Sequence, residues 1–412
     1  MTLRTVEEQL ADVLATSAPL PHEELPLAAA AGRTTAVPVA ARVDIPVFDN
    51  SAMDGFAVRY ADVAGVDDAH PARLRVVADL PAGTDLDPSI EAGCAARIMT
   101  GSALPSAADT VVPFEDTVGG LADSLGEITV LRAPRAIGAH VRRRAADAAV
   151  GTEIVPAGTL LGPLQLSAAA AAGVAAVTVH RAPRVAVIST GSELVTPGTP
   201  LRRGQIPESN GLLLAALAED AGAEVVLRTS VDDTDAAFLA AIAAATAAGA
   251  DVVITSGGVS EGAFEVVKNV LQGSDVAFTR VAMQPGKPQG FGRLAGGALL
   301  FGLPGNPVSS AVSFEVFVRP ALLRFQGRTS LHRPVLRLPA AVGWRTPPGR
   351  RQYLPAAIDR ADPSRWSVRP ATAGGSGSHL AGGLARAEAY AVVAAEIDEV
   401  RPGDAVDVML IS

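Results

Sequence analysis

Apolar residues at helical spacing open the chain. Val6, Leu10 and Val13 recur at intervals of three and four residues, which places them on one face of a helix. Thr5 precedes this run and Glu8 follows it by three residues, the spacing of a capping box at a helix start. The pattern therefore predicts an amphipathic helix near the beginning of the sequence.

The next hundred residues have a different pattern. Residues 36–150 contain short runs rich in Val and Ile, such as 74–78 and 127–131, separated by Gly, Pro and Asp. These runs are typical of strands joined by turns, and the spacers are too short for helices between parallel strands. The segment 154–180 carries no ionised side chain, but Pro and Gly interrupt it and Ala dominates it. We expect a buried helix followed by a strand there, not a membrane span.

From residue 184 onward, apolar strands alternate with helices of about ten residues or more. The predicted strands are 185–188, 224–227, 251–254, 276–281 and 299–301, and the predicted helices are 211–221, 236–248, 264–271 and 308–325. Such alternation is typical of a parallel sheet with helices on both faces. After about residue 327 the pattern returns to strands at 335–338, 389–393 and 405–410, which predicts a small antiparallel domain of about 80 residues.

Composition narrows the class of protein. The chain has 412 residues, 49% of them hydrophobic, with 34 basic against 43 acidic residues and a net charge of −9. This balance disfavours wholesale binding to nucleic acid or to anionic membranes. The single cysteine, Cys94, fits a reducing compartment, and the six histidines lack zinc-ligand spacing. The first residues lack the apolar run of a signal peptide, so we expect a cytoplasmic protein.

Lysine is rare in this chain. Only two of the 34 basic residues are lysines, Lys268 and Lys287. An ammonium is more compact than the planar guanidinium, so a lysine in an arginine-using chain can have a specific contact to make. Lys287 lies in a Pro-Gly-Lys-Pro turn at 285–288, where it could contact a phosphate or another oxyanion. The alternative is an ordinary surface lysine.

Three polar, Gly-rich loops follow predicted strands, at 189–193, 255–260 and 302–309. Ligands of an open parallel sheet bind beyond the carboxyl ends of its strands. Backbone N–H groups freed by Gly, together with hydroxyl groups, can cradle phosphate there. One such loop can exist for packing alone, whereas three on one edge favour a phosphate-bearing ligand.

Four carboxylates accompany these loops: Glu193, Asp232, Asp233 and Glu265. A solvated acidic face is one interpretation, and for the adjacent pair Asp232 and Asp233 it is nearly as strong as a functional one. In a phosphate site, however, carboxylates commonly hold Mg²⁺, which prefers hard oxygen ligands and bridges to phosphate oxygens.

The β-rich region has polar clusters of its own, at 49–55, 97–101 and 142–147. The first has the acceptors and Gly of a tight turn. The last contains Arg142, Arg143 and Arg144, the densest positive patch of an acidic chain. Three adjacent arginines are typical of a solvated edge strand, but they could also steer an oxyanion substrate.

Six motifs, taken together and in order, resemble those of the molybdopterin molybdenumtransferase family, to which the C-terminal part of gephyrin is similar. They lie at 49–55, 98–101, 189–194, 256–260, 285–288 and 302–309 and span nearly the whole chain. The resemblance implies a multidomain α/β protein whose central domain is a three-layer, doubly wound αβα unit like the molybdopterin adenylyltransferases. We expect residues 1–180 to form a linker region with an inserted β-rich domain at about 47–145, residues 181–327 the central domain, and residues 328–412 a C-terminal β-barrel.

The resemblance also implies the reaction. The family takes adenylylated molybdopterin and molybdate, uses Mg²⁺ or a similar cation, cleaves the pyrophosphate link and releases AMP. It implies an elongated homodimer with each site between the central domain of one subunit and the β-rich domain of the other. A molybdopterin adenylyltransferase and recipient molybdoenzymes would be its partners.

Site residues carried over from the matching motifs fall into three groups. The expected catalytic residues are Asp54, Thr100, Asp147, Glu193, Glu265 and Lys287, and Glu193 and Glu265 are the expected metal ligands. The expected substrate-binding residues are Ser51, Arg142, Arg143, Arg144, Thr190, Gly191, Asp232, Ser256, Gly257, Gly258, Ser260, Pro304, Gly305, Asn306, Pro307 and Ser309.

The chain departs from the family pattern at four positions. Ser192 and Glu265 stand where Asp is common, and Arg280 and Gln284 stand where Lys is common. Two other functions share parts of the pattern: a molybdopterin adenylyltransferase, which would match the central residues alone, and a non-catalytic molybdopterin-binding or scaffold protein. Pyrophosphate release from ATP and molybdopterin would identify the first, and stable peptide binding without turnover would identify the second.

Overall fold

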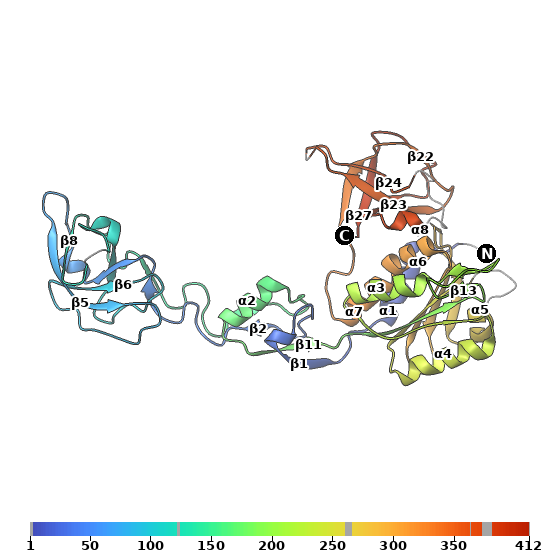
Figure 1. The fold of residues 1–412 in the computed structure, drawn as a ribbon, viewed down its shortest axis with the longest axis horizontal. Helices are drawn as coiled ribbons and strands as arrows, with labels where there is room; N and C mark the ends of the chain where they lie inside the picture. The colour runs from blue at the N-terminus through green and yellow to red at the C-terminus, as the bar shows by residue number, and fades with distance from the viewer. Residues whose placement is uncertain (1–2, 122–123, 260–265, 363, 373–380, 412) are drawn as a thin grey trace.

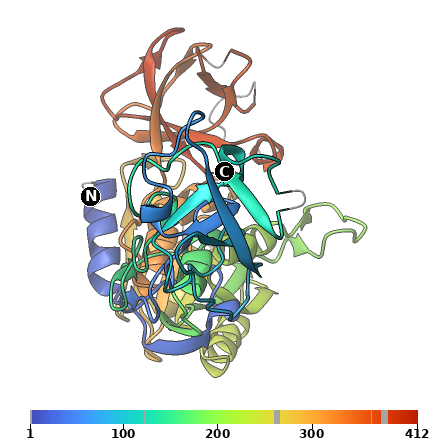
Figure 2. The ribbon, with the colours of Figure 1, turned by 90° about the vertical axis from the view of Figure 1, so that its left-hand side faces the viewer.

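The computed structural model is an elongated, bent molecule, in which a β-rich N-terminal domain and the central domain lie at opposite ends of a narrow linker (Figure 1). It describes all residues except 1–2, 122–123, 260–265, 363, 373–380 and 412. Seen along the long axis, the C-terminal domain stands to one side of the central domain (Figure 2). No helix in the described part of the chain is long and apolar enough to cross a membrane.

The central domain is built on a six-stranded sheet in the order β15-β12-β16-β20-β19-β17. The first four strands are parallel, as predicted: β15 (Glu224–Val231), β12 (Arg184–Thr190), β16 (Val252–Ser256) and β20 (Leu299–Leu303). β19 (Pro288–Arg293) was not predicted and runs antiparallel to both β20 and β17 (Val276–Arg280). The prediction of a wholly parallel sheet is therefore wrong at one strand, whose Gly-rich sequence lacks the usual strand signal.

Helices cover both faces of this sheet, as the alternating pattern predicted. On one face lie α1 (Val6–Thr16), α3 (Asn210–Asp220), α6 (Pro307–Ser313), a π-helical segment (Phe314–Val318) and α7 (Arg319–Phe325). On the other lie α4 (Asp235–Ala247) and α5 (Val266–Leu271). Along β12, Val187 packs into the first core, while its neighbours Ala186 and Ile188 pack into the second. A strand buried on both faces is typical of doubly wound proteins.

The opening helix forms where its pattern predicted. Thr5 caps α1, and its hydroxyl accepts from the Glu8 backbone while the Glu8 carboxylate accepts from Thr5 N–H, which completes the capping box. Val6 and Val13 are buried in the core of the central domain, where α1 packs against α7. We expected this helix within the N-terminal region. In the structure it packs against the central domain, and Glu7 also pairs with Arg351 of the C-terminal domain.

The linker has a small core between two short sheets and one helix. β1 (His22–Pro26) pairs with β11 (Ala176–His180), and β2 (Val39–Ala40) pairs with β10 (Glu153–Val155). α2 (Pro163–Ala171) precedes β11, so the helix and strand predicted within 154–180 are both present. A single 3₁₀ turn, Leu27–Ala29, lies beside them.

The N-terminal β domain contains a five-stranded sheet in the order β7-β4-β6-β5-β8. Its strands are β4 (Gly55–Val58), β5 (Ala72–Leu80), β6 (Cys94–Ile98), β7 (Thr110–Pro113) and β8 (Glu127–Val130), with 3₁₀ turns at Tyr60–Asp62 and Phe114–Asp116. Phe56 and Ile98 belong to separate apolar clusters, so the sheet is covered on both faces. A two-strand pair, β3 (Asn50–Ser51) with β9 (Val141–Arg142), lies beside it.

The C-terminal domain is a barrel, as expected. Its main sheet has antiparallel neighbours in the spatial order β23, β25, β27 and β21. β24 pairs with the other edge of β23. A bridge between Ala340 and Val368 of β24 brings β21 and β24 together and closes the ring. The elements of this domain are β21 (Val335–Pro339), β22 (Trp344–Arg345), β23 (Arg351–Asp359), β24 (Ser367–Pro370), α8 (Ala381–Leu384), β25 (Ala389–Val393), β26 (Glu399–Val400) and β27 (Ala405–Leu410). β18 (Met283–Gln284), from the central segment, pairs with β23.

Candidate functional site

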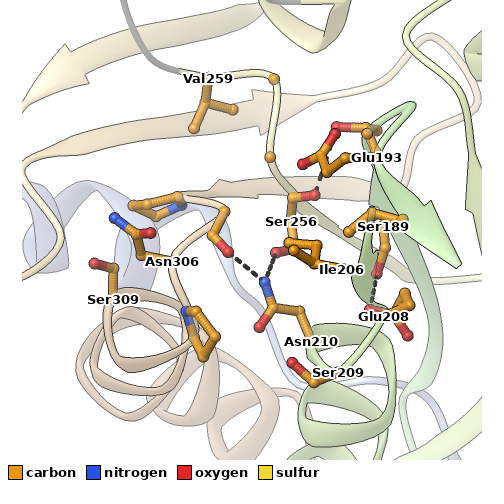
Figure 3. Close-up of a pocket in the computed structure, with 18 of the residues that line it drawn as sticks. Ser189, Glu193, Ile206, Glu208, Ser209, Asn210, Ser256, Val259, Asn306 and Ser309 are labelled. Carbon is orange, nitrogen blue, oxygen red and sulfur yellow. Dashed lines mark hydrogen bonds between the residues drawn. The ribbon is translucent and has the colours of Figure 1, made fainter. Parts of the chain in front are cut away.

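A cavity of about 710 Å³ opens at the carboxyl ends of β12, β16 and β20 (Figure 3). It is lined by residues 189–191, 193–194, 206–210, 233, 256–259, 284–288, 304–307 and 309. The three loops that the sequence placed on one edge of the sheet therefore meet at one cavity. Twelve of the predicted residues line it: Thr190, Gly191, Glu193, Ser256, Gly257, Gly258, Lys287, Pro304, Gly305, Asn306, Pro307 and Ser309. Two others, Ser260 and Glu265, lie outside the described residues.

The glycines of the β16 loop allow close packing of the loops. Gly257 has φ of +97°, and a Cβ there would lie 2.6 Å from the carbonyl oxygen of Thr190. Gly258 has φ of +68°, and its Cβ would lie 2.8 Å from Val267. Both the backbone conformation and the space therefore require glycine. The Thr190 hydroxyl donates to the Ser256 carbonyl oxygen at 3.5 Å, a long contact between the first two loops.

The β12 loop brings one exposed carboxylate to the cavity. Glu193 folds back over Gly191, where a Cβ would lie 2.7 Å from its Oε2. Ser192 N–H donates to Asp233 Oδ2 at 2.9 Å, and Asp233 lines the cavity. Asp232, the predicted residue, does not line it and instead accepts from the backbone and hydroxyl of Thr234 at the start of α4. The geometry thus favours the second carboxylate of this pair.

Sequence reasoning missed the segment Glu208-Ser209-Asn210, which enters the cavity just before and at the start of α3. Glu208 Oε1 accepts from the Ser189 hydroxyl at 2.8 Å and from Gly211 N–H at 2.7 Å (Figure 3). Asn210 lines the same cavity. The available signal was a cluster of three polar residues directly before a predicted helix at the ligand-binding edge of the sheet.

Lys287 lines the cavity from a firmly held turn and is half-buried. Its carbonyl accepts from Val281 N–H at 2.8 Å. The neighbouring Gly286 carbonyl accepts from Gln289 Nε2 at 2.6 Å, and the same amide donates to Ser313 Oγ at 2.7 Å. The backbone that carries the ammonium is therefore fixed, and the side chain stays available to a ligand.

The C-terminal domain reaches the rim of this cavity. Arg350 Nη1 donates to Gln284 Oε1 at 2.7 Å, and Gln284 is a lining residue. The departure from lysine at position 284 therefore removes one cation, while an arginine from another domain lies in contact with the same side chain. Three lining carboxylates, Glu193, Glu208 and Asp233, face one lining lysine. Within the described residues, no three His, Cys, Asp or Glu side chains form a ready metal cluster.

A second group of predicted residues lies in the N-terminal β domain. Asp54 Oδ1 accepts from both the backbone N–H and the hydroxyl of Thr100, each at 2.7 Å. These two donors stabilise the carboxylate and hold the pKa of Asp54 below its usual range, the backbone N–H having the larger effect. Ser51 is buried and its hydroxyl donates to the Met53 carbonyl, so this predicted ligand residue has a local structural contact.

The three adjacent arginines differ in their surroundings. Arg143 pairs with Asp49 at 2.6 Å, and Arg144 pairs with Asp44. Arg142 is exposed and forms no ion pair with any residue that the structure describes. Asp147 is also exposed. The neighbouring carboxylates therefore neutralise two of the three cations, and Arg142 is the one available to a ligand.

These two groups do not meet within one chain. The cavity lies in the central domain. The second group lies in the region at the far end of the linker (Figure 1) and comprises Asp54, Thr100, Arg142 and Asp147. Each group carries part of the predicted site, and the linker keeps them apart.

Comparison with known proteins identifies the family. Residues 4–173 match the MoeA N-terminal region (domains I and II), residues 186–324 a probable molybdopterin binding domain, and residues 337–411 the MoeA C-terminal region (domain IV). Molybdopterin molybdenumtransferase 2 of Mycobacterium tuberculosis is 43% identical over 367 residues, covering 87% of this chain and 88% of that protein. This chain belongs to the molybdopterin molybdenumtransferase family. It is therefore a transferase of molybdenum cofactor biosynthesis.

Other members of the molybdopterin molybdenumtransferase family match over the full length. Molybdopterin molybdenumtransferase 1 of M. tuberculosis is 35% identical and covers 100% of this chain and 99% of that protein. A solved structure of a molybdopterin biosynthesis MoeA protein from Pyrococcus horikoshii OT3 covers 100% of both chains with a TM-score of 0.83 and 26% identity. A second Pyrococcus MoeA structure gives a TM-score of 0.81 at 32% identity over 99% of both chains. The multidomain fold is thus that of the family.

Proposed function

We propose that this protein inserts molybdenum from molybdate into adenylylated molybdopterin, with Mg²⁺-dependent cleavage of the pyrophosphate link and release of AMP. One observation carries the proposal: loops from three adjacent parallel strands converge on a cavity of about 710 Å³ beside a half-buried lysine. A cavity of this kind suits a ligand that has phosphates between two larger groups. Family membership and the match of residues 186–324 to a probable molybdopterin binding domain support the same substrate class.

Lys287 is the residue placed to neutralise phosphate or molybdate oxygens. Its turn is held by Gln289 and Ser313, so the ammonium can meet an anion without reorganising the backbone. Arg350 lies at the rim in contact with Gln284 and adds positive charge on the same side. Both cations would balance the negative charge that develops on the leaving AMP phosphate.

The donor set of the cavity fits Mg²⁺ bound together with substrate. Mg²⁺ in phosphate sites usually takes one or two carboxylates and fills its remaining positions with water and phosphate oxygens. Glu193 is an exposed carboxylate on the cavity wall and Asp233 lies nearby on the same wall, so these residues would hold the ion. When bound, Mg²⁺ would neutralise charge on the phosphate oxygens. Glu265, the other predicted ligand, lies outside the described residues.

The remaining predicted residues would come from a second copy of the chain. Asp54, Thr100, Arg142 and Asp147 belong to the region at the far end of the linker from the cavity. In a two-fold symmetric dimer, each contact is made twice, so each N-terminal β domain can close the cavity of its partner. We propose this homodimer as the active form, in the cytoplasm, supplied by a molybdopterin adenylyltransferase and serving molybdoenzymes.

The first experiment measures AMP release from adenylylated molybdopterin with and without Mg²⁺ and molybdate, together with the molybdenum content of the product. Molybdate-dependent release with metal in the product is the expected result. Pyrophosphate release from ATP and molybdopterin would indicate the adenylyltransferase instead. Peptide binding without turnover would indicate a scaffold.

Lys287→Ala tests the lysine assignment, with Lys268→Ala as the control because these are the only two lysines. Loss of one preorganised charge contact to the transition state should reduce AMP release by about 100-fold. Lys268→Ala should retain turnover. Wild-type turnover in Lys287→Ala with a wild-type melting temperature would refute the assignment.

Mixed dimers test the shared site. Lys287→Ala and Asp54→Ala should each be inactive alone. In a random mixture half of the dimers contain one subunit of each kind, and one of their two sites is intact, so activity should recover to about 25% of wild type. If both residues served one site within a single chain, mixing would restore nothing, and the dimer proposal would be wrong.

A further inference from the structure

Asn210 joins three loops around the cavity. Its Nδ2 donates to Ser256 Oγ at 2.7 Å and to the Gly305 carbonyl oxygen at 2.6 Å (Figure 3). Ser256 ends β16 and Gly305 lies between β20 and α6, while Asn210 begins α3. One side-chain amide therefore uses both of its hydrogens to connect segments about 50 and 95 residues away in the sequence.

The connection continues beyond Ser256. Ser256 Oγ lies 3.3 Å from Ser310 Oγ, and Ser310 Oγ donates to the Pro304 carbonyl oxygen at 2.5 Å. Ser256 and Ser310 are 2% and 0% exposed, so this chain of hydrogen bonds is shielded from water. It fixes the carbonyls of two successive residues, Pro304 and Gly305. Fixing these carbonyls also fixes the peptide planes of the loop that forms one wall of the cavity.

We propose that Asn210 is a positioning residue, whose amide holds the β20 loop against the β16 loop before substrate binds. This inference rests on the proposed function, because the reaction it serves is molybdenum insertion at this cavity. A loop held in the productive geometry lowers the reorganisation needed to reach the transition state. Asn210 acts through the loops, since its Oδ1 is buried and accepts from no described residue.

The proposed role depends on the two amide hydrogens of Asn210. A residue of similar shape without these hydrogens therefore distinguishes the positioning role from simple space filling. Asn210→Asp keeps the shape but places a carboxylate opposite the Gly305 carbonyl oxygen, 2.6 Å from the present Nδ2. Asn210→Ala removes the donors without adding charge. Both variants should lose at least about tenfold in kcat/KM, because two hydrogen bonds that shape the site are absent. A space-filling role would leave the exchange of the 302–312 peptide unchanged in both variants, because the added charge of Asn210→Asp by itself lowers kcat/KM for an anionic substrate but frees no loop amide.

Hydrogen–deuterium exchange tests whether Asn210 holds the β20 loop, and it does not depend on enzyme turnover. Amides in the peptide covering residues 302–312 should exchange faster in both variants, with no change in the N-terminal β domain. Leu212→Ala, an exposed position on the same helix, is the control and should alter neither exchange nor turnover. Equal melting temperatures would confirm that the fold is retained.

Unchanged exchange at 302–312 in both Asn210→Asp and Asn210→Ala would overturn the assignment, whatever their kcat/KM. Absence of turnover in the wild-type protein would instead count against the proposed function. The exchange measurement would still decide whether Asn210 holds the loop, so the two failures are distinguishable.

Discussion

Asp251 fixes the junction between the linker and the central domain. Its carboxylate accepts from Arg181 Nη1 at 2.9 Å, from Arg181 Nη2 at 2.8 Å and from Arg184 N–H at 2.8 Å. Arg181 follows the last strand of the linker, and Arg184 begins β12. Asp251→Ala removes all three bonds at once, so it should destabilise the central domain and loosen the attachment of the linker.

The magnitude follows from exposure. The side chains of Arg181 and Asp251 are 35% and 19% exposed, so water screens the ion pair and its loss costs about 1 kcal/mol. The Arg184 N–H left without an acceptor adds about 1–2 kcal/mol. A total of about 2–3 kcal/mol corresponds to a fall of about 5–10 °C in the melting temperature of a domain of this size.

Calorimetry resolves the effect by domain. Both tryptophans, Trp344 and Trp366, lie in the C-terminal domain, so tryptophan fluorescence follows that domain while calorimetry records the central transition as well. Glu127→Ala is the matched control, because the Arg73–Glu127 pair is exposed at 76% and 59% and its loss should be nearly neutral. A central transition in Asp251→Ala that moves no further than in Glu127→Ala would refute the reasoning.

Two further predictions concern the loops and the distal cluster. Thr100→Ala should raise the pKa of Asp54 toward its usual value. The wild-type stability advantage should be full near pH 7, begin to fall near pH 4 and be lost as the pH drops through the lowered folded pKa, because the two donors stabilise only the ionised carboxylate. Urea unfolding at pH 7 and pH 3 checks this, and an equal gap at both pH values would contradict it. Gly257→Ala should destabilise the central domain by more than Gly297→Ala: both have positive φ, but only at Gly257 does the new Cβ meet an atom, Thr190 O at 2.6 Å. Equal melting temperatures of the two variants would contradict the clash.

The central fold was predictable because its inner strands β12, β16 and β20 are buried and carry a continuous apolar signal. β12 shows this directly, with Val187 and Ile188 packing into different cores. β19 escaped prediction because Gly290 and Gly292 lie where neighbouring atoms leave no space for a Cβ. β23 was not predicted because Pro355 interrupts its apolar run. In both strands, tertiary contacts select residues that local propensity disfavours.

The site was predictable where its residues are local to a strand end. The three loops and Glu193 follow this rule, whereas Lys287 was singled out by the rarity of lysine in the chain. Asn210 could not be predicted in this way, because its hydrogen-bond partner Gly305 is 95 residues away and no local sequence pattern indicates that contact. The choice between Asp232 and Asp233 also required the structure, since adjacent side chains point in different directions and only Asp233 faces the cavity.

The packing of α1 on α7 has a consequence for synthesis. About 300 residues separate the two helices in the sequence, and the whole linker and N-terminal β domain lie between them. At about 5–20 residues per second, the ribosome needs roughly 15–60 s to produce α7 after α1 has emerged. During that interval Val6 and Val13 lack the helix against which α1 packs, whereas the N-terminal β domain has its own apolar clusters and can already fold. The first helix made is therefore among the last to reach its native packing, and until then its apolar face has no native partner on α7.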